Sequence, residues 1–197
     1  MGHMYVFRDK SANGVFIEDV NGMLWKTDDW DGSVKPNAIA VIADESKFRI
    51  ALNEPSSRMA ISCNSDPLED YMTEIIVRTA ARADYNGACN TAKILRMRSS
   101  IGYAAGYCNA FTFPDGKTKG FLPSLGQLYL AYQNKDAVDA ALNKCGGTAM
   151  TSSYYWSSSF WGIYGGGRRC WELFWGDGTI GYDRLDYGTY VRPFANF

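Results

Sequence analysis

The chain has 197 residues, of which 46% are hydrophobic, and its formal net charge is −1. This length and apolar content suffice for the core of one domain, or of one domain with a small annex. The basic residues do not gather into runs, which argues against a nucleic-acid-binding groove. No stretch of about 18 apolar residues occurs, so the sequence predicts no membrane span.

The N-terminal third predicts a β segment over residues 5–66. Residues 1–4 (Met-Gly-His-Met) have the character of an expression-tag scar and contain the only histidine, so they are set aside from functional reasoning. Asn21-Gly22, between the apolar residues 14–17 and 23–25, predicts a hairpin, because both turn positions tolerate positive φ. The apolar runs 38–43 and 48–52 predict strands in the middle of a sheet.

The middle of the chain predicts helices. Ser65-Asp66-Pro67 predicts a helix start, since a capping residue precedes a proline at the first helical position. The apolar face of that helix would consist of Tyr71, Met72, Ile75, Ile76 and Thr79. Asn86-Gly87 would end it, and a second helix is expected at about residues 91–98. A stretch of small residues, 102–110, and a turn at residues 115–117 follow.

The last helices and strands are the most clearly marked. Ser124 and Gln127 form a capping box ahead of apolar residues at helical spacing, and a shorter helix over residues 136–143 should end at Gly146-Gly147. Residues 173–175 and 179–182 flank Gly176-Asp177-Gly178 and predict a hairpin, while residues 190–193 predict a closing strand. The order of strands, then helices, then strands predicts an α+β fold.

The five cysteines are Cys63, Cys89, Cys108, Cys145 and Cys170. They are widely spaced, include no C-x-x-C pair and lack a usable histidine partner, so a zinc site is not expected. The odd number favours buried thiols made in a reducing compartment. One disulfide, between Cys89 and Cys108, remains an alternative.

Residues 154–197 have an unusual composition. They contain 14 of the 29 aromatic residues, eight glycines and four arginines, but no lysine, although nine lysines precede them. Tyr, Trp and Arg set among Gly and Ser, with Lys depleted, are typical of a contact surface. Antibody paratopes share this composition, because rigid rings supply contact area and small residues supply adaptability. The sequence therefore predicts a binding face in this region.

Four segments, in order, resemble one known family. They are GFLPSLGQLYLAYQN (residues 120–134), AL…GG (141–147), YYWSSS (154–159) and YVRPF (190–194). Together they resemble the C-type-lectin-like domain of bacterial surface proteins and of the variable proteins of diversity-generating retroelements. The resemblance implies helices packed on small antiparallel sheets, with a scaffold over residues 67–197 and a variable region at about 155–194. It also implies a structural role for Arg192.

In that family, mutagenesis directed at adenines rewrites the variable region, mainly at Asn codons. An AAC codon randomised at its first two bases cannot encode Trp, Glu, Lys, Met or Gln. Between residues 160 and 190, only Trp161, Trp171, Glu172 and Trp175 lie outside the reachable set, so they are expected to be framework. The resemblance implies diversified ligand contacts at Phe160, Tyr164, Arg168, Arg169, Phe174, Tyr182, Asp183, Arg184, Leu185 and Tyr187.

The function implied is ligand or receptor recognition without catalysis, cofactor or metal. The partner would be a protein or glycan on a target cell surface, bound from a virion tail tip or a bacterial cell surface. A fixed-specificity adhesin or carbohydrate-binding lectin-like domain is the alternative, and homo-oligomer formation is left open.

Two further classes fit the sequence less well. Calcium-dependent lectins use Glu-Pro-Asn-like and Trp-Asn-Asp motifs, whereas this chain has Asn53-Glu54-Pro55 and Trp175-Gly176-Asp177. The related formylglycine-generating oxidase needs a reactive cysteine pair, and only Cys170 lies in the suspected face. A structural module that forms trimers or assembles a fibre tip would have an interface of similar composition.

Overall fold

The first half of the described chain forms most of a five-stranded sheet. The computed structural model describes residues 12–197, so the predicted tag scar at residues 1–4 lies outside the described residues. The sheet has the order β2-β1-β3-β4-β8 and is antiparallel throughout. Its strands are β1 (Gly14–Asp19), β2 (Leu24–Trp25), β3 (Pro36–Ile42), β4 (Lys47–Ile50) and β8 (Phe194–Asn196).

The predicted hairpin and central strands are confirmed. β1 pairs with β2 through a turn in which the Gly22 N–H donates to the Asp19 carbonyl at 2.9 Å. Only Gly22 takes a positive φ (+80°), while Asn21 does not. The Asn21 N–H instead donates to the Asp19 carboxylate, which also accepts from the Met23 N–H and the Trp25 indole. The apolar strand β3 lies at the centre of the sheet, where both of its faces are buried.

The predicted helix after Ser65-Asp66-Pro67 is wrong. The chain forms only a 3₁₀ turn, η2 (Leu68–Asp70), and α1 begins at Arg78. Between them the backbone is held by distant partners, because the Ile75 N–H donates to the Phe160 carbonyl and its carbonyl accepts from the Trp171 indole. The Asp66 carboxylate binds Arg98 instead of capping a helix. The β-branched run around Ile75 also lowers helix propensity.

The helices at residues 87–97, 125–133 and 135–144 follow the sequence pattern with shifted boundaries, whereas the helix at residues 104–110 forms in the stretch of small residues, where none was predicted. Asn86 occupies the N-cap position of α2 without a side-chain capping hydrogen bond, so Asn86-Gly87 begins a helix where an end was predicted. The capping box of α4 is present, with Gln127 Oε1 accepting from the Ser124 N–H at 3.1 Å. Gly146 ends the next helix with φ +78°. The helices are α1 (Arg78–Arg82), α2 (Gly87–Met97), α3 (Ala104–Ala110), α4 (Leu125–Gln133) and α5 (Lys135–Lys144), beside the 3₁₀ turn η1 (Thr27–Asp29).

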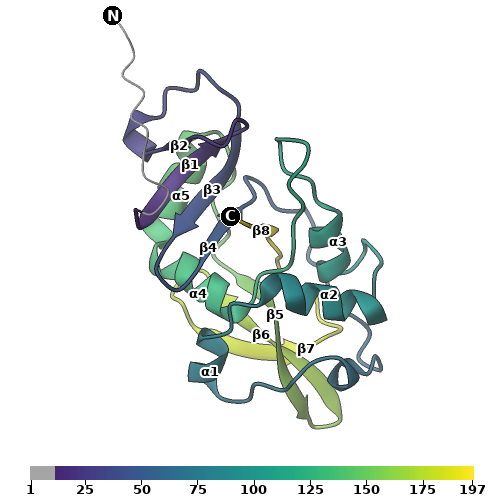
Figure 1. Ribbon diagram of the computed structural model, residues 1–197. Helices are drawn as coiled ribbons and strands as arrows, with labels where there is room; N and C mark the ends of the chain where they lie inside the picture. The colour runs from purple at the N-terminus through teal and green to yellow at the C-terminus, as the bar shows by residue number, and fades with distance from the viewer. Residues whose placement is uncertain (1–11) are drawn as a thin grey trace, which may run out of the picture.

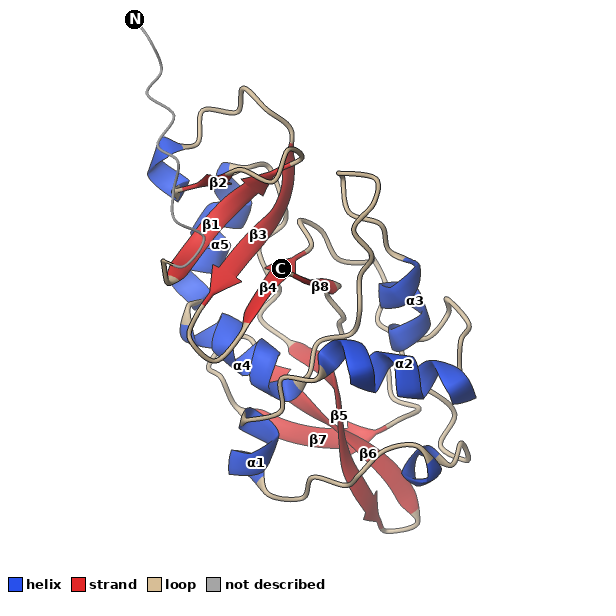
Figure 2. Cartoon of the chain, in the orientation of Figure 1, coloured by secondary structure: helices blue, strands red, loops and turns tan. Residues whose placement is uncertain are grey.

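The C-terminal part forms a second, three-stranded antiparallel sheet in the order β5-β6-β7. Its strands are β5 (Tyr154–Tyr164), β6 (Gly167–Phe174) and β7 (Ile180–Arg184), so the hairpin predicted around Gly176-Asp177-Gly178 is confirmed. The predicted closing strand at residues 190–193 forms only an isolated bridge, Tyr155 with Tyr190, and the chain joins the first sheet four residues after Tyr190 as β8. Figures 1 and 2 show the two sheets at opposite ends of the molecule, with helices beside and between them.

One hydrophobic core spans both sheets. It includes Ile39 and Phe48 from the first sheet, Leu128 from α4, and Trp171 and Trp175 from the second sheet. The α5 helix packs on β1 and β3, and α4 packs on β5 and β6. The predicted segments 5–66 and 67–197 therefore share one core, within an α+β fold of small antiparallel sheets and short helices. Across residues 12–197, no helix is long and apolar enough to cross a membrane.

Arg192 joins four parts of the chain. Its side chain is buried, and its guanidinium donates to the Ala51 carbonyl at 3.0 Å, the Thr148 carbonyl at 2.9 Å and the Glu54 carboxylate at 3.1 Å. Glu54 also accepts from the Tyr155 hydroxyl at 2.6 Å. Burial, and then this hydrogen bond, raises the pKa of Tyr155, so the phenol stays protonated and donates. Arg192 therefore has the structural role that the sequence implies.

Replacing Arg192 by Met should destabilise the fold by about 3–5 kcal/mol, because the Glu54 carboxylate would stay buried without its cation. Urea unfolding monitored by circular dichroism measures the loss. Arg184→Met is the matched control, since it removes an arginine whose ion pair with Asp186 is largely solvent-exposed, and it should lose only a small fraction of that amount. Equal losses for the two variants would contradict the central role of Arg192.

Candidate binding face

Ser159, the last of three consecutive buried serines, anchors β5 to the start of α4 and to Asp84. Ser157, Ser158 and Ser159 are fully buried. The Ser159 hydroxyl donates to the Asp84 carboxylate at 2.6 Å and accepts from the Leu125 N–H at 2.9 Å, which satisfies a free donor at the start of α4. These bonds fix β5 in position, so the strands beyond it are displayed from a rigid base.

The β5–β6 hairpin ends in a tight two-residue turn. Tyr164 pairs with Gly167, and the two residues between them, Gly165 and Gly166, have φ values of +60° and +75°. Positive φ at both central positions defines a type I′ turn, which matches the twist of the flanking strands and strongly favours glycine. The glycine-rich stretch is thus a defined turn that orients the side chains on either side of it.

Four side chains beside this turn form what we call the aromatic cluster: Trp161, Tyr164, Arg169 and Tyr182. The Tyr182 ring stacks on Trp161 with centroids 4.3 Å apart, and Trp161 meets Tyr164 edge to face at 6.2 Å. The Arg169 guanidinium lies 5.6 Å from the centroid of Tyr164 and 6.0 Å from that of Tyr182. Tyr164 and Tyr182 remain 62% and 41% exposed. This pattern of stacked rings and a cation joins three strands into one surface.

Arg169 has unused hydrogen-bonding capacity. Its Nε is buried and has no acceptor in the described part of the chain. Its Nη1 lies 3.8 Å from Asp183 Oδ1, which is a long ion pair. A buried donor without a partner is unfavourable, and the Nε itself is too buried for a ligand to reach. A ligand could contact the Nη groups instead, because the side chain is 19% exposed and its ion pair with Asp183 is long.

Two other predicted contact residues are arginines with partners inside the protein. Arg168 makes a two-pronged ion pair with Glu69, and its Nη1 donates to the Asn64 carbonyl at 3.1 Å. The hydrogen bond and charge of Arg168 lower the pKa of Glu69. Arg184 makes a similar pair with Asp186, at 3.0 and 2.7 Å. Both arginines lie at the surface, but a ligand would have to compete with these carboxylates.

Two predicted contact residues, Phe160 and Leu185, lie in the core. Both are fully buried and pack in a cluster with Trp156 and Cys170. The cause at Phe160 is an irregularity in β5, where the register with β6 shifts between Trp156 and Phe160 and again before Gly162. A register shift changes which side chains face the interior, so simple alternation misplaces this residue. Neither side chain can touch a ligand in this conformation.

The expected framework residues are buried or partly buried. Trp171 and Trp175 are buried and donate their indole N–H groups to the Ile75 carbonyl at 2.7 Å and the Asp139 carboxylate at 3.1 Å. Trp161 is half-buried and supports Tyr182. Large rings whose polar atom has a partner are typical of well-packed interiors.

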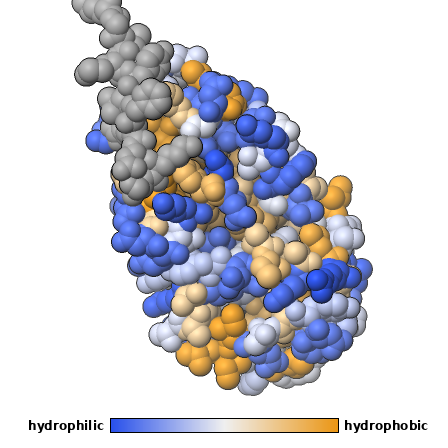
Figure 3. Space-filling model, viewed as in Figure 1, coloured by the Kyte–Doolittle hydropathy of each residue, from blue (hydrophilic) through white to orange (hydrophobic). Residues whose placement is uncertain are grey.

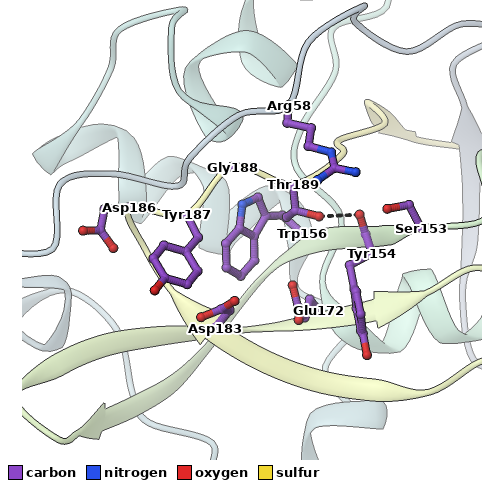
Figure 4. Close-up of a pocket in the computed structure, with 10 residues that line it drawn as sticks. All are labelled: Arg58, Ser153, Tyr154, Trp156, Glu172, Asp183, Asp186, Tyr187, Gly188 and Thr189. Atoms are coloured by element: carbon purple, nitrogen blue, oxygen red, sulfur yellow. Dashed lines mark hydrogen bonds between the residues drawn. The ribbon is translucent and has the colours of Figure 1, made fainter.

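A pocket of about 450 Å³ lies on the same sheet, between β5, β6, β7 and the loop after β7 (Figure 4). The predicted contacts Asp183 and Tyr187 line it, as does Tyr154. The ring of Phe174, a further predicted contact, packs against Tyr154 with the ring centroids 5.1 Å apart. Glu172 also lines the pocket and is only 8% exposed. Burial, and then the charge of Asp183, raises the pKa of Glu172 to about 7. The sequence predicted Glu172 as framework, and no local pattern signalled this pocket.

The motifs weighed for other chemistry have structural partners. Glu54, in the calcium-motif comparison, is engaged by Arg192, and the Asp177 carboxylate accepts from the Thr179 N–H in a turn. All five cysteines are free, so no Cys89–Cys108 disulfide forms. Burial raises the pKa of the Cys170 thiol, which disfavours the reactive thiolate. Within residues 12–197, no group of three or more His, Cys, Asp or Glu side chains could hold a metal ion.

Comparison with known proteins gives no relative: no protein family model matches the chain, and no curated protein or solved structure matches it significantly. The side chains of the three-stranded sheet and their geometry therefore carry the functional inference.

Glu172 should make the stability of the protein depend on pH. Its pKa is about 7 in the fold against 4.5 in the unfolded chain, so the fold keeps a proton that the unfolded chain releases. Stability should therefore fall as the pH rises from about 4.5 to about 7, by on the order of 2 kcal/mol once partial solvent screening is allowed for. Urea unfolding at several pH values measures this slope.

Glu172→Gln should flatten that slope and make the protein more stable than wild type at about pH 8, with little difference at about pH 5. Asp177→Asn, at an exposed carboxylate in the β6–β7 turn, is the control and should keep the wild-type slope. An unchanged slope in Glu172→Gln would mean that the carboxyl is solvated in the folded protein.

Proposed function

We propose that this protein is a recognition module that binds a ligand or receptor through the aromatic cluster on β5-β6-β7. The observation that carries the proposal is the group of exposed Tyr164 and Tyr182 rings around Arg169, whose ion pair with Asp183 is long, at 3.8 Å. Tyr and Arg at the centre of an interface contribute most of the binding energy in many complexes. A protein or a glycan on a target cell surface fits this chemistry, since both offer carbonyl or hydroxyl acceptors and faces for stacking.

The rigidity of the display supports recognition by a preformed surface. The hairpin turn is set by two glycines at positive φ, and β5 is held by the Ser159–Asp84 bond. Tyr182 is held by stacking on Trp161. Because these side chains are already ordered, binding sacrifices little conformational entropy. Modest affinity at one site can be raised by presenting several copies together.

We further propose that the fold is C-type-lectin-like and that the binding face is diversified by a retroelement. Helices packed on two small antiparallel sheets agree with the first part. Burial of Trp171, Glu172 and Trp175, which codon randomisation cannot create, agrees with the second, as does the exposure of Tyr164, Tyr182 and Tyr187, which it can. A virion tail tip or a bacterial cell surface is the proposed location.

A lectin-like adhesin of fixed specificity is the second candidate. The exposed apolar groups on the three-stranded sheet favour it, because sugar rings stack on exposed aromatic faces. Figure 3 shows apolar surface at the lower end of the molecule, where Figure 1 places α1 and the β5–β6 hairpin. The exposed apolar side chains there include Ile76, Val77 and Ile163.

Removing both exposed rings of the cluster should abolish binding without unfolding the protein. Labelled Tyr164→Ala/Tyr182→Ala protein should lose at least about tenfold in affinity for the bacterial strains or array glycans that wild type binds. Its melting temperature should fall only modestly, since Tyr164 is 62% exposed and Tyr182 is 41% exposed.

Ile101→Ala is the control, because it removes a more exposed apolar side chain from the α2–α3 loop, away from the sheet. This variant should bind like wild type. If the double tyrosine variant binds as tightly as Ile101→Ala, the aromatic cluster is not the contact surface.

Diversification has a separate test in the DNA. Sequencing downstream of the coding region should find a near-repeat of the segment for residues 160–192, differing mainly at template adenines and lying beside a reverse transcriptase. Its absence would leave the fixed-specificity adhesin as the function.

A further inference from the structure

The pocket beside the aromatic cluster contains a carboxyl group that no internal interaction explains. Only 8% of the Glu172 surface is exposed, and no hydrogen-bond donor or cation within residues 12–197 pairs with its carboxyl group. Its neighbour across the β6–β7 ladder is Gly181, and a Cβ at that position would lie 3.3 Å from Glu172 Oε1. The absence of a side chain at Gly181 thus leaves room for the Glu172 carboxyl, which shares the pocket with the carboxyl of Asp183 (Figure 4).

We infer that this pocket binds an organic cation, a primary ammonium or a guanidinium, between the carboxyl groups of Glu172 and Asp183. This inference names one chemical group of the proposed ligand. It rests on the proposed binding function only where it assigns that group to a binding partner.

Charge and shape both favour a cation there. Two neighbouring carboxyls repel each other when both are ionised. Asp183 Oδ1 already lies 3.8 Å from Arg169 Nη1 and accepts from the Arg184 N–H at 2.7 Å, which leaves its second oxygen and the oxygens of Glu172 for a cation. A cation between them removes the remaining repulsion and satisfies those oxygens. The walls include the rings of Tyr154 and Tyr187, whose faces attract cations and whose apolar area accommodates an alkyl stem. A volume of about 450 Å³ is ample for a lysine or arginine side chain.

The other charged groups of the pocket argue against an anion and a metal ion. The Arg58 guanidinium lies 5.2 Å from the Tyr190 ring centroid, and Figure 4 shows it on the opposite side of the pocket from Glu172 and Asp183. Asp186 is already paired with Arg184. That leaves two carboxyls for a metal, whereas Ca²⁺ takes six to eight oxygen ligands.

Cation binding should be linked to proton release. The titratable and charged groups around Glu172 are Asp183 on β7, Tyr154 on β5, Arg58 on the loop after β4, and Asp186 and Tyr187 after β7. Burial and Asp183 keep Glu172 largely protonated below about pH 7, and a bound cation favours its ionised form. Affinity for a cation should therefore rise from about pH 6 to about pH 8.

The test titrates the full chain with Nα-acetyl-lysine amide and Nα-acetyl-arginine amide, followed by the backbone amide NMR signals of residues 187–189. Either compound should give saturable shifts, stronger at the higher pH, while the neutral Nα-acetyl-norleucine amide should not. Glu172→Gln and Asp183→Asn should each weaken binding by about tenfold or more, because each removes a charge-assisted contact. Asp177→Asn makes the same charge change outside the pocket and should leave binding unchanged.

Other outcomes would overturn the inference. Equal binding of the norleucine compound would mean that the pocket selects for apolar groups. Binding of Nα-acetyl-glutamate amide would mean that it is an anion site formed by Arg58. Saturable shifts with CaCl₂ alone would mean that it is a metal site. Absence of binding by both cations would also overturn it. Since these probes need no partner, a negative result leaves the aromatic-cluster proposal standing, and loss of partner binding in Tyr164→Ala/Tyr182→Ala leaves the pocket result standing.

Discussion

The buried ion pair of Arg192 with Glu54 is the contact on which the rest of the architecture depends. Through it the end of β4, the loop before β5, the first residues of β5 and the return to the first sheet meet at one point. A buried pair of charges is costly to desolvate, so further hydrogen bonds must offset that cost. Here the Ala51 and Thr148 carbonyls and the Tyr155 hydroxyl make those bonds, while the buried Arg192 Nε has no partner within residues 12–197. These contacts specify how the two sheets sit relative to each other.

Local signals in the sequence predicted much of this fold. The Asn21-Gly22 hairpin, the capping box at Ser124 and the glycine hairpin at residues 176–178 were all found where expected, because each depends on a few adjacent residues. The segment around Ile75 was not, because its backbone bonds to Phe160 and Trp171, far along the chain. Tertiary hydrogen bonds overrode a capping pattern that is favourable in isolation.

The candidate site was predictable by region more than by residue. Composition predicted a binding face at the C-terminal strands, and Tyr164, Arg169 and Tyr182 come together there. Phe160 escaped prediction because an irregular register turns it inward. The carboxyl of Glu172 escaped because its surroundings are assembled from β5, β7 and the Arg58 loop, which only the fold brings together. Contacts between segments that are distant along the chain cannot be predicted from local patterns in one sequence.

The burial of Phe160 and Leu185 beside Cys170 has a consequence for any mutagenesis of this strand pair. All three belong to one packed cluster with Trp156, so a polar or much smaller side chain at these positions would leave a void or an unpaired polar atom. Variants would then be filtered by folding before they could be tested for recognition. Fewer variants of these strands would therefore fold than could be encoded, and changes of side chain would be tolerated best at the outward-facing positions, such as Tyr164 and Tyr182.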